Sequence, residues 1–174
     1  MLFTSWLFLK FFAIVLIGLW LLPTIRLRQL LILLASAYFY ASWKPAYILV
    51  LAAPAVIDYF CAIRIENTDD PRSRRFWLIV SLVSNLGLLA YFKYTNFFID
   101  AFSGILGTAP THLSIVLPIG ISFFVFKTLS YTIDVYRREL KACREWWRYA
   151  MFVSYFPELV AGPIVRASVF LPQL

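Results

Sequence analysis

The sequence of 174 residues is 62% hydrophobic and only 14% charged, whereas ordinary soluble domains are about 25% charged. A soluble domain of this length has too little interior for so much apolar surface, so the composition predicts an integral membrane protein made mostly of spanning helices. The net charge of +7 does not indicate nucleic-acid binding, because the basic residues lie between apolar runs and not along one solvated face.

The first two apolar runs differ in length. The run over 2–22 is long enough to span a bilayer, and Lys10 is its one charged residue. It has no basic segment before it and no small-residue cleavage site after it, so it predicts a retained helix and not a signal peptide. The run over 30–43 is short, so it either spans the bilayer or forms a re-entrant or interfacial segment.

The next three runs, over 46–63, 76–92 and 115–135, each have the length of a spanning helix, which needs about 17–25 residues. We expect the helix of the last run to begin near Pro118, because proline suits a first helical turn. The stretch 95–112 contains glycines, a proline and the single histidine, and it predicts an extracytoplasmic loop.

The sixth run, 146–165, is interrupted by Pro157, Gly162 and Pro163. Irregular backbone at membrane depth is tolerated only where it is buried in protein or borders a cavity. The run therefore predicts a broken or re-entrant segment at a cavity wall, with a kinked structural helix as the alternative. The predicted fold class is all-α: a polytopic membrane helix bundle over 1–174, in a single domain, with about five spans and one broken segment.

Basic residues gather on one side of the predicted membrane. If 30–43 spans, the loops after the first, third and fifth runs share a side, and the excess of Lys and Arg there places the N-terminus outside the cytoplasm. If 30–43 is re-entrant, the N-terminus lies inside. Both arrangements place the loops 64–75 and 137–148 in the cytoplasm, where the second loop either only fixes orientation or also binds phosphates of acyl-CoA or anionic lipids. In the first arrangement the shared side contains eleven of the 16 basic residues, namely Arg26, Arg28, Arg64, Arg72, Arg74, Arg75, Arg137, Arg138, Lys141, Arg144 and Arg148.

Charged side chains inside apolar runs are costly and are functional candidates for that reason. Two of them are seven residues apart in the fifth run, and two polar residues between them share their face of a helix, which we expect to point into the bundle. Glu158 follows Pro157 near the start of a half-helix, where a negative charge is favourable. The candidates for a tunnel lining or polar interior are Asp58, Lys127, Ser130, Tyr131, Asp134 and Glu158.

These candidates have a structural interpretation as well as a functional one. In the functional one, they line a substrate tunnel. In the structural one, Lys127 pairs with Asp58 or another carboxylate, and Asp134 pairs with Arg138 four residues later. His112 is more typical of a solvated loop histidine than of a general base, because local spacing offers it no Ser, Cys or Asp partner.

Two long motifs closely resemble the signature regions of the membrane-bound O-acyltransferase family. They are LPIGISFFVFKTLSYTIDVYR (117–137) and FVSYFPELVAGPIVR (152–166), and the opening MLFTSWLFL is similar to the start of the alginate O-acetyltransferase branch. Members of the family commonly have Gln where Lys127 and Glu158 stand here.

The resemblance implies transfer of an acyl group, usually acetyl, from a cytoplasmic donor such as acetyl-CoA toward an extracytoplasmic polysaccharide such as alginate. Family members use an intramembrane histidine, which has a pKa suited to acyl chemistry. That histidine belongs to the later part of the family's sequence, and His112 matches neither its position nor its context. The chain therefore resembles the N-terminal portion of such an enzyme, which we expect to be inactive alone, with no catalytic residue, bound cofactor or metal of its own.

The implied location is the bacterial inner (cytoplasmic) membrane, with several passes. The implied partners are the lipid bilayer, the remainder of the fold, and an extracytoplasmic acetyltransferase or other polysaccharide-modifying protein, with no nucleic acid. Two alternatives stay open. One is the branch of the family that transfers D-alanyl groups to teichoic acid, and the other is a non-catalytic transporter or export subunit.

Overall fold

The computed structural model describes residues 5–42, 44–106, 113–118, 120–161 and 165–174, and these residues form helices and no strand. The predicted all-α class is therefore confirmed. The elements are α1 (Trp6–Leu21), α2 (Ile25–Ala41), α3 (Ala46–Glu66), α4 (Pro71–Leu89), the π-helix η1 (Ala90–Tyr94), α5 (Thr95–Leu106), α6 (Ile121–Tyr136), α7 (Trp146–Ser154), α8 (Phe156–Ala161), α9 (Ala167–Phe170) and the 3-10 helix η2 (Leu171–Gln173).

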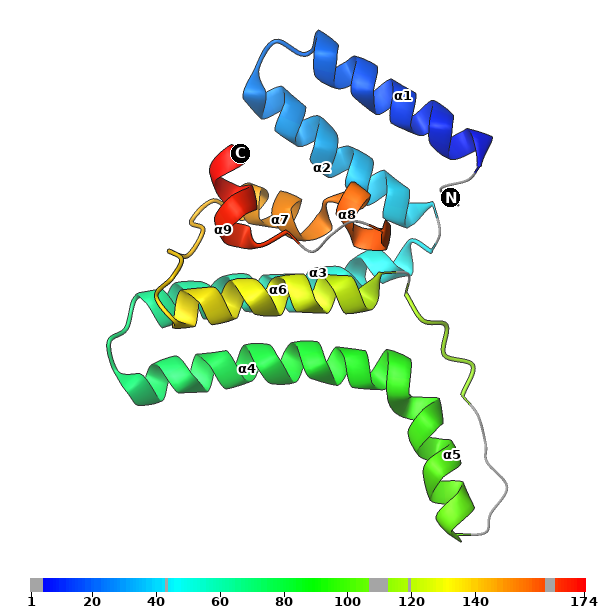
Figure 1. The fold of residues 1–174 in the computed structure, drawn as a ribbon, viewed down its shortest axis with the longest axis vertical. Coiled ribbons are helices and arrows are strands. Elements are labelled where there is room, and N and C mark those ends of the chain that lie inside the picture. Colours follow the sequence, from blue (N-terminus) through cyan, green and yellow to red (C-terminus); the bar gives the residue numbers. More distant parts are fainter. Residues whose placement is uncertain (1–4, 43, 107–112, 119, 162–164) are drawn as a thin grey trace.

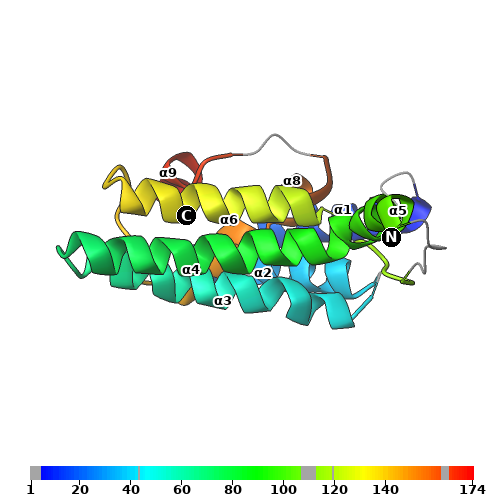
Figure 2. The ribbon, with the colours of Figure 1, turned by 90° about the horizontal axis from the view of Figure 1, so that it is seen from below.

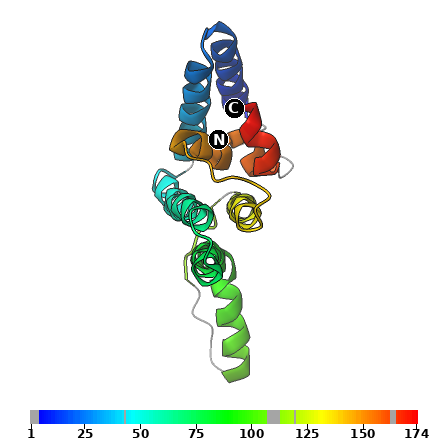
Figure 3. The same cartoon turned by 90° about the vertical axis from the view of Figure 1, so that its left-hand side faces the viewer.

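The helices form three groups (Figure 1). The central group consists of α3, α4 and α6, which run side by side (Figure 2). The antiparallel hairpin of α1 and α2 lies on one side of it, and the short helices α7, α8 and α9 lie between the two (Figure 3). The core follows this arrangement: its fully buried side chains include Ile65 of α3, Val125 of α6 and Phe152 of α7.

Capping residues, and not the ends of apolar runs, determine where the helices begin. The carboxylate of Asp70 accepts hydrogen bonds from the backbone N–H of Arg72 (3.2 Å) and Ser73 (3.0 Å), so α4 begins at Pro71, five residues before its apolar run. Likewise the hydroxyl of Thr24 caps α2, which begins at Ile25. Residues 30–41 of the predicted short segment are thus part of a longer helix.

The predicted loop over 95–112 is wrong for its first part, because α4 continues through the π-helix η1 into α5. Phe97, Phe98 and Phe102 recur at helical spacing, which favours a helix over a loop. The π-turn bends the helix at this point, and α5 leaves the bundle (Figures 1 and 3). His112 lies outside the described residues.

Two glycines mark close packing and a sharp turn. An added Cβ at Gly18 of α1 would lie 2.7 Å from a methyl carbon of Leu31 in α2, so a glycine allows these helices to approach. Gly120 has φ 76°, in the left-handed region, and its turn sets the start of α6 at Ile121. The expected start near Pro118 is therefore wrong by three residues.

The turn at Gly120 gives a direct prediction about stability. Gly120→Ala places a Cβ in left-handed backbone, and we expect it to lower the free energy of unfolding by about 1–2 kcal/mol. Gly87→Ala is the matched control, because Gly87 lies inside α4 and an added Cβ meets nothing within 4 Å; it should raise stability by about 0.5–1 kcal/mol. Thermal unfolding of the two purified variants in detergent measures both. Equal midpoints would contradict the assigned turn.

Two helical stretches of the described chain are long and apolar enough to cross a membrane, judged by length and composition: Ala46–Glu66 and the continuous stretch Pro71–Ile105. Helix α1 is apolar but shorter. The predicted number of about five spans stays a prediction.

Candidate functional site

A hydrogen-bonded polar cluster joins the three central helices. Asp58 of α3 accepts hydrogen bonds from the hydroxyl of Ser81 (2.6 Å) and the amide nitrogen of Asn85 (2.7 Å), both on α4. Thr128 of α6 donates to the amide oxygen of Asn85 (2.8 Å). All four side chains are fully buried. The carboxylate therefore meets two donors, and each of the three helices contributes to the cluster.

A buried ion pair joins α6 to the broken segment. The ammonium group of Lys127 is bonded to the carboxylate of Glu158 in the first turn of α8, and their side chains are 3% and 12% exposed. The same ammonium lies 4.7 Å from the ring centroid of Phe152 and 5.0 Å from that of Phe170. Four helices thus meet at one positive charge, because these residues come from α6, α8, α7 and α9.

The sequence left open which carboxylate pairs with Lys127, and the structure identifies it. Asp58 is bonded to Ser81 and Asn85, so it is the other carboxylate, Glu158, that neutralises Lys127. A pair is what burial requires, since an uncompensated charge in a low-dielectric interior is very costly. Whether these residues also line a substrate tunnel stays a prediction.

The other three candidates have separate surroundings. The hydroxyl of Ser130, which is half-buried, donates to the backbone oxygen of Lys127 in its own helix (2.8 Å). Tyr131 is fully buried, its hydroxyl accepts from the backbone N–H of Cys143 (2.9 Å), and its ring lies 4.8 Å from that of Tyr149. Ser130 and Tyr131 therefore contact different parts of the chain, although they are neighbours in α6.

The predicted ion pair between Asp134 and Arg138 is wrong. Arg138 has φ 64°, outside the helix, and its guanidinium bonds the carboxylate of Asp69 (2.6 Å). Arg144 similarly bonds Glu66 (2.6 Å). Asp134 is buried, and its backbone oxygen accepts from two residues of the following turn. These contacts tie the loop 137–148 to the end of the α3–α4 hairpin.

The sixth apolar run is divided into α7 and α8, with Tyr155 between them. The backbone N–H of Phe156, at the break, donates to the hydroxyl of Ser36 in α2 (3.3 Å). Pro157 then lies in the first turn of α8, where it blocks no helical hydrogen bond. Residues 162–164 lie outside the described part of the chain.

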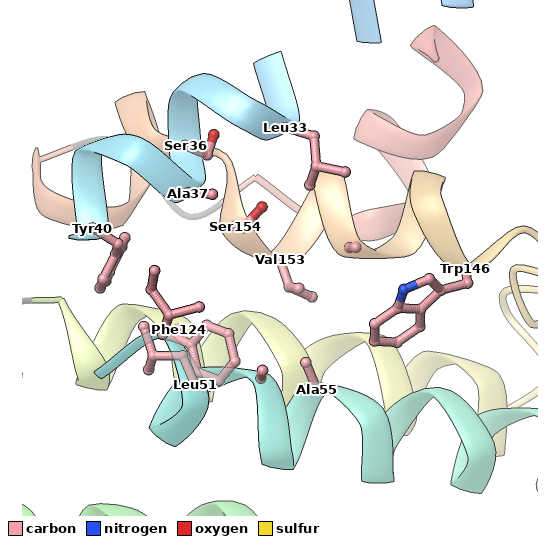
Figure 4. A pocket seen from close by; sticks show the side chains of 13 residues that line it. Leu33, Ser36, Ala37, Tyr40, Leu51, Ala55, Phe124, Trp146, Val153 and Ser154 are labelled. Atoms are coloured by element: carbon pink, nitrogen blue, oxygen red, sulfur yellow. The ribbon is translucent and has the colours of Figure 1, made fainter. Parts of the chain in front are cut away.

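An apolar cavity of about 170 Å³ lies beside this break (Figure 4). Its walls come from α2, α3, α6 and α7, and they include Leu33, Leu51, Ala55, Phe124, Trp146 and Val153. The hydroxyl of Ser36 is bonded to Ile32 and Phe156, whereas that of Ser154 is buried with no partner among the described residues.

The chemistry available in the described residues is that of ion pairing and hydrogen bonding. No three of their His, Cys, Asp and Glu side chains come together as a possible metal site. Cys143 is the more accessible of the two free thiols, but burial raises its pKa, so less of it is the reactive thiolate at neutral pH.

Reasoning from the sequence missed Ser81, Asn85 and Thr128, which complete the polar cluster. A signal was present: Ser81 and Asn85 are four residues apart in an apolar run, so they share a face of α4. Serine, asparagine and threonine are common in membrane helices, so they do not stand out in a sequence. A buried carboxylate such as Asp58, however, needs hydrogen-bond donors close to it, and these residues were candidates for that role.

Comparison with curated proteins finds relatives along almost the whole chain. The probable alginate O-acetylase of Pseudomonas aeruginosa is 42% identical over 99% of this chain, and that of Azotobacter vinelandii is 42% identical over 95%. A peptidoglycan O-acetyltransferase of Helicobacter pylori is 34% identical over 83%. No family model matches the sequence, and no solved structure matches it. The chain spans about a third of the length of these relatives, 34%, 34% and 32% in turn.

Proposed function

Because this chain belongs to the membrane-bound O-acyltransferase family, in the branch of the alginate O-acetylases, we propose that it forms part of an enzyme that O-acetylates an extracytoplasmic polysaccharide. The observation that carries the proposal is the 42% identity to probable alginate O-acetylases over 99% of the chain. The acetyl donor is a cytoplasmic thioester such as acetyl-CoA, and the remainder of the full-length protein supplies the catalytic histidine.

The surface of the molecule supports a place in the membrane. Away from the face that packs on α2, helix α1 exposes apolar side chains, among them Trp6 (80% exposed) and Trp20 (83% exposed), and Val15 is its one buried residue. A helix that is hydrophobic on every side is stable in a protein core or in lipid. Since α1 lies at the outside of the bundle (Figure 1), lipid is the surrounding that we propose, in the bacterial inner membrane.

The distribution of charge supports one orientation. The start of α2, the α3–α4 turn and the loop 137–148 lie at the same end of the bundle (Figure 1). Arg26 and Glu145 line one pocket there, which supports the arrangement in which the second segment crosses the membrane. The positive-inside rule places this end in the cytoplasm and the N-terminus on the opposite side.

The proposed reaction is tested by deleting the full-length gene in its host and restoring it on a plasmid. Ester-linked acetate on the purified extracellular polysaccharides and on peptidoglycan is then measured by proton NMR. We expect acetate on one of them to fall on deletion and to return with the plasmid. Unchanged acetate, or a loss of D-alanyl ester instead, would overturn the proposal in favour of the D-alanyl branch or of export without catalysis.

The orientation predicts which side of the membrane labels Cys143. A membrane-impermeant maleimide should react with Cys143 in inside-out vesicles and not in intact spheroplasts, while buried Cys61 adds no background. Because burial raises the pKa of Cys143 and so reduces its thiolate fraction at neutral pH, the labelling rate should increase as the pH is raised from about 7 to about 8. Labelling of intact spheroplasts would overturn this orientation.

A further inference from the structure

Helix α5 has one apolar face and one polar face. Phe98, Phe102 and Ile105 recur at spacings of four and three residues, so their side chains share a face. They are 50%, 61% and 79% exposed, in that order. The polar residues share the opposite face at the same spacings, and they are Asn96, Asp100 and Ser103. Large apolar side chains gathered on one exposed face indicate a contact surface for an apolar partner.

The polar face of α5 is the one that the chain itself contacts. The side-chain amide of Asn96 donates to the backbone oxygen of Leu113 (3.0 Å) and accepts from the backbone N–H of the same residue (3.0 Å). The segment 113–118 is held a second time by the hydroxyl of Tyr47 in α3, which donates to the backbone oxygen of Val116 (2.7 Å). The chain therefore uses the polar face and leaves the apolar face to another partner.

Helix α5 begins where the chain leaves the proposed membrane. α4 and η1 have 19 and 5 residues, so together they extend about 35 Å, which exceeds the roughly 30 Å of the hydrocarbon core of a bilayer. Their first turn contains Arg72 and Arg75, at the end that we place in the cytoplasm. The residues of α5 are thus not needed to complete this span.

Residues typical of a membrane–water interface gather at the start of α5. Tyr91 and Tyr94 of η1 are exposed, and the ammonium group of Lys93 lies 5.5 Å from the ring centroid of Tyr94. Tyr47 of α3 lies at the same level, because its ring is 6.1 Å from that of Phe92. Tyrosine and lysine suit this depth, since their apolar parts stay in the membrane while the hydroxyl and ammonium groups reach water.

The direction of α5 agrees with a place at the surface of the membrane. Figure 2 shows α4 lengthwise and α5 nearly end-on, whereas Figure 3 shows α4 end-on and α5 lengthwise. Since α4 crosses the proposed membrane, α5 runs along its plane. A helix with this direction and one apolar face can bury that face at the boundary between head groups and acyl chains.

We propose that α5 is an interfacial helix that binds the extracytoplasmic surface of the lipid bilayer. The side chains of Phe98, Phe102 and Ile105 insert below the head groups, and Asp100 faces water. Because α5 contains no lysine or arginine, its attachment depends on apolar area and not on anionic lipids. The segment 113–118, which Asn96 joins to α5, is thereby held at the same surface. The inference rests on the membrane placement proposed above.

The test uses nitroxide labels on single cysteines of the full-length protein, in vesicles of phosphatidylethanolamine and phosphatidylglycerol. Electron paramagnetic resonance measures how often each label collides with oxygen, which concentrates in hydrocarbon, and with a nickel complex that stays in water. Oxygen should collide more often at Phe98→Cys, and nickel more often at Asp100→Cys. Shielding of position 98 from both reagents would show a protein partner, and free access of nickel would show water. Either result would overturn the proposal.

A label at Ile105→Cys reports whether α5 stays attached. Phe98→Asp combined with Phe102→Asp should change this label from more collisions with oxygen to more collisions with nickel. Ser103→Asp, which adds the same charge on the polar face, should leave the preference for oxygen unchanged. A preference for oxygen that survives the double substitution would contradict the proposal, and so would its loss in concentrated salt, because charge would then hold the helix.

A label on α1 separates this inference from the membrane placement on which it rests. Ile14 is 68% exposed, so a label at Ile14→Cys should collide mainly with oxygen if α1 lies in lipid. Oxygen contact at position 14 together with nickel contact at position 98 would contradict only the inference about α5. Nickel contact at both positions would contradict the membrane placement itself.

Discussion

Glu158→Ala is expected to reduce acetyl transfer by the full-length protein at least about tenfold per molecule, and to reduce its abundance less. Removal of this carboxylate leaves the ammonium of Lys127, which is 3% exposed, without its counter-charge, and breaking a buried pair costs about 3–5 kcal/mol. The measurement is ester-linked acetate on the polysaccharide, divided by the amount of protein in the membrane.

Two further variants make the result interpretable. Lys127→Gln combined with Glu158→Gln removes both charges and keeps a hydrogen-bonded pair, so it should recover much of what Glu158→Ala loses. Glu139→Ala is the control, because Glu139 pairs with Arg137 on the surface, where such pairs contribute about 0–1 kcal/mol. Transfer per molecule unchanged in Glu158→Ala would show that the pair only supports the fold and that the tunnel prediction is wrong.

Asp58→Leu is expected to cause a large loss of stability in the central group of helices. It leaves the buried donors Ser81 and Asn85 without their acceptor, at a cost of about 1–3 kcal/mol for each unpaired group. Asp58→Asn keeps an acceptor oxygen and should lose much less. The midpoint of thermal unfolding in detergent, followed by size-exclusion fluorescence, compares the two.

A matched pair on α4 tests the same cluster from its donor side. Ser81→Ala removes a hydrogen bond to Asp58 and should lower the midpoint clearly, while Ser84→Ala, on the half-buried face of the same helix, should change it little. If Ser81→Ala and Ser84→Ala had the same midpoint, Asp58 would not depend on this donor.

The helical class and the broken segment could be predicted from the sequence because both depend on local rules. Pro157 interrupts an apolar run in any context, and the division into α7 and α8 agrees with that expectation. The extent of α4 could not be read from hydropathy, since Asp70 and Pro71 begin the helix among charged residues. Likewise α5 was predicted as a loop because a glycine and a proline follow it, although its phenylalanines have helical spacing.

Individual residues of the candidate site could be predicted from the sequence, but which of them contact one another could not. The need of Lys127 for a carboxylate follows from burial alone, but the choice of Glu158 over Asp58 depends on which helices meet. Both carboxylates are far from Lys127 along the chain, and pairing between distant segments is a property of packing. The pocket shared by Arg26 and Glu145 likewise joins residues that no local pattern connects.

The polar cluster on α3 and α4 has a consequence for the order in which the chain is made. Asp58 and its two donors lie on consecutive helices joined by a short turn, so the hairpin can satisfy the carboxylate before any later residue leaves the ribosome. Thr128, which reaches Asn85 from α6, is synthesised afterwards and adds a hydrogen bond to a pair that is already complete. The carboxylate of Asp58 therefore need not enter lipid without hydrogen-bond partners, because the α3–α4 hairpin can insert as a unit. The inserted hairpin then provides the surface on which α6 packs.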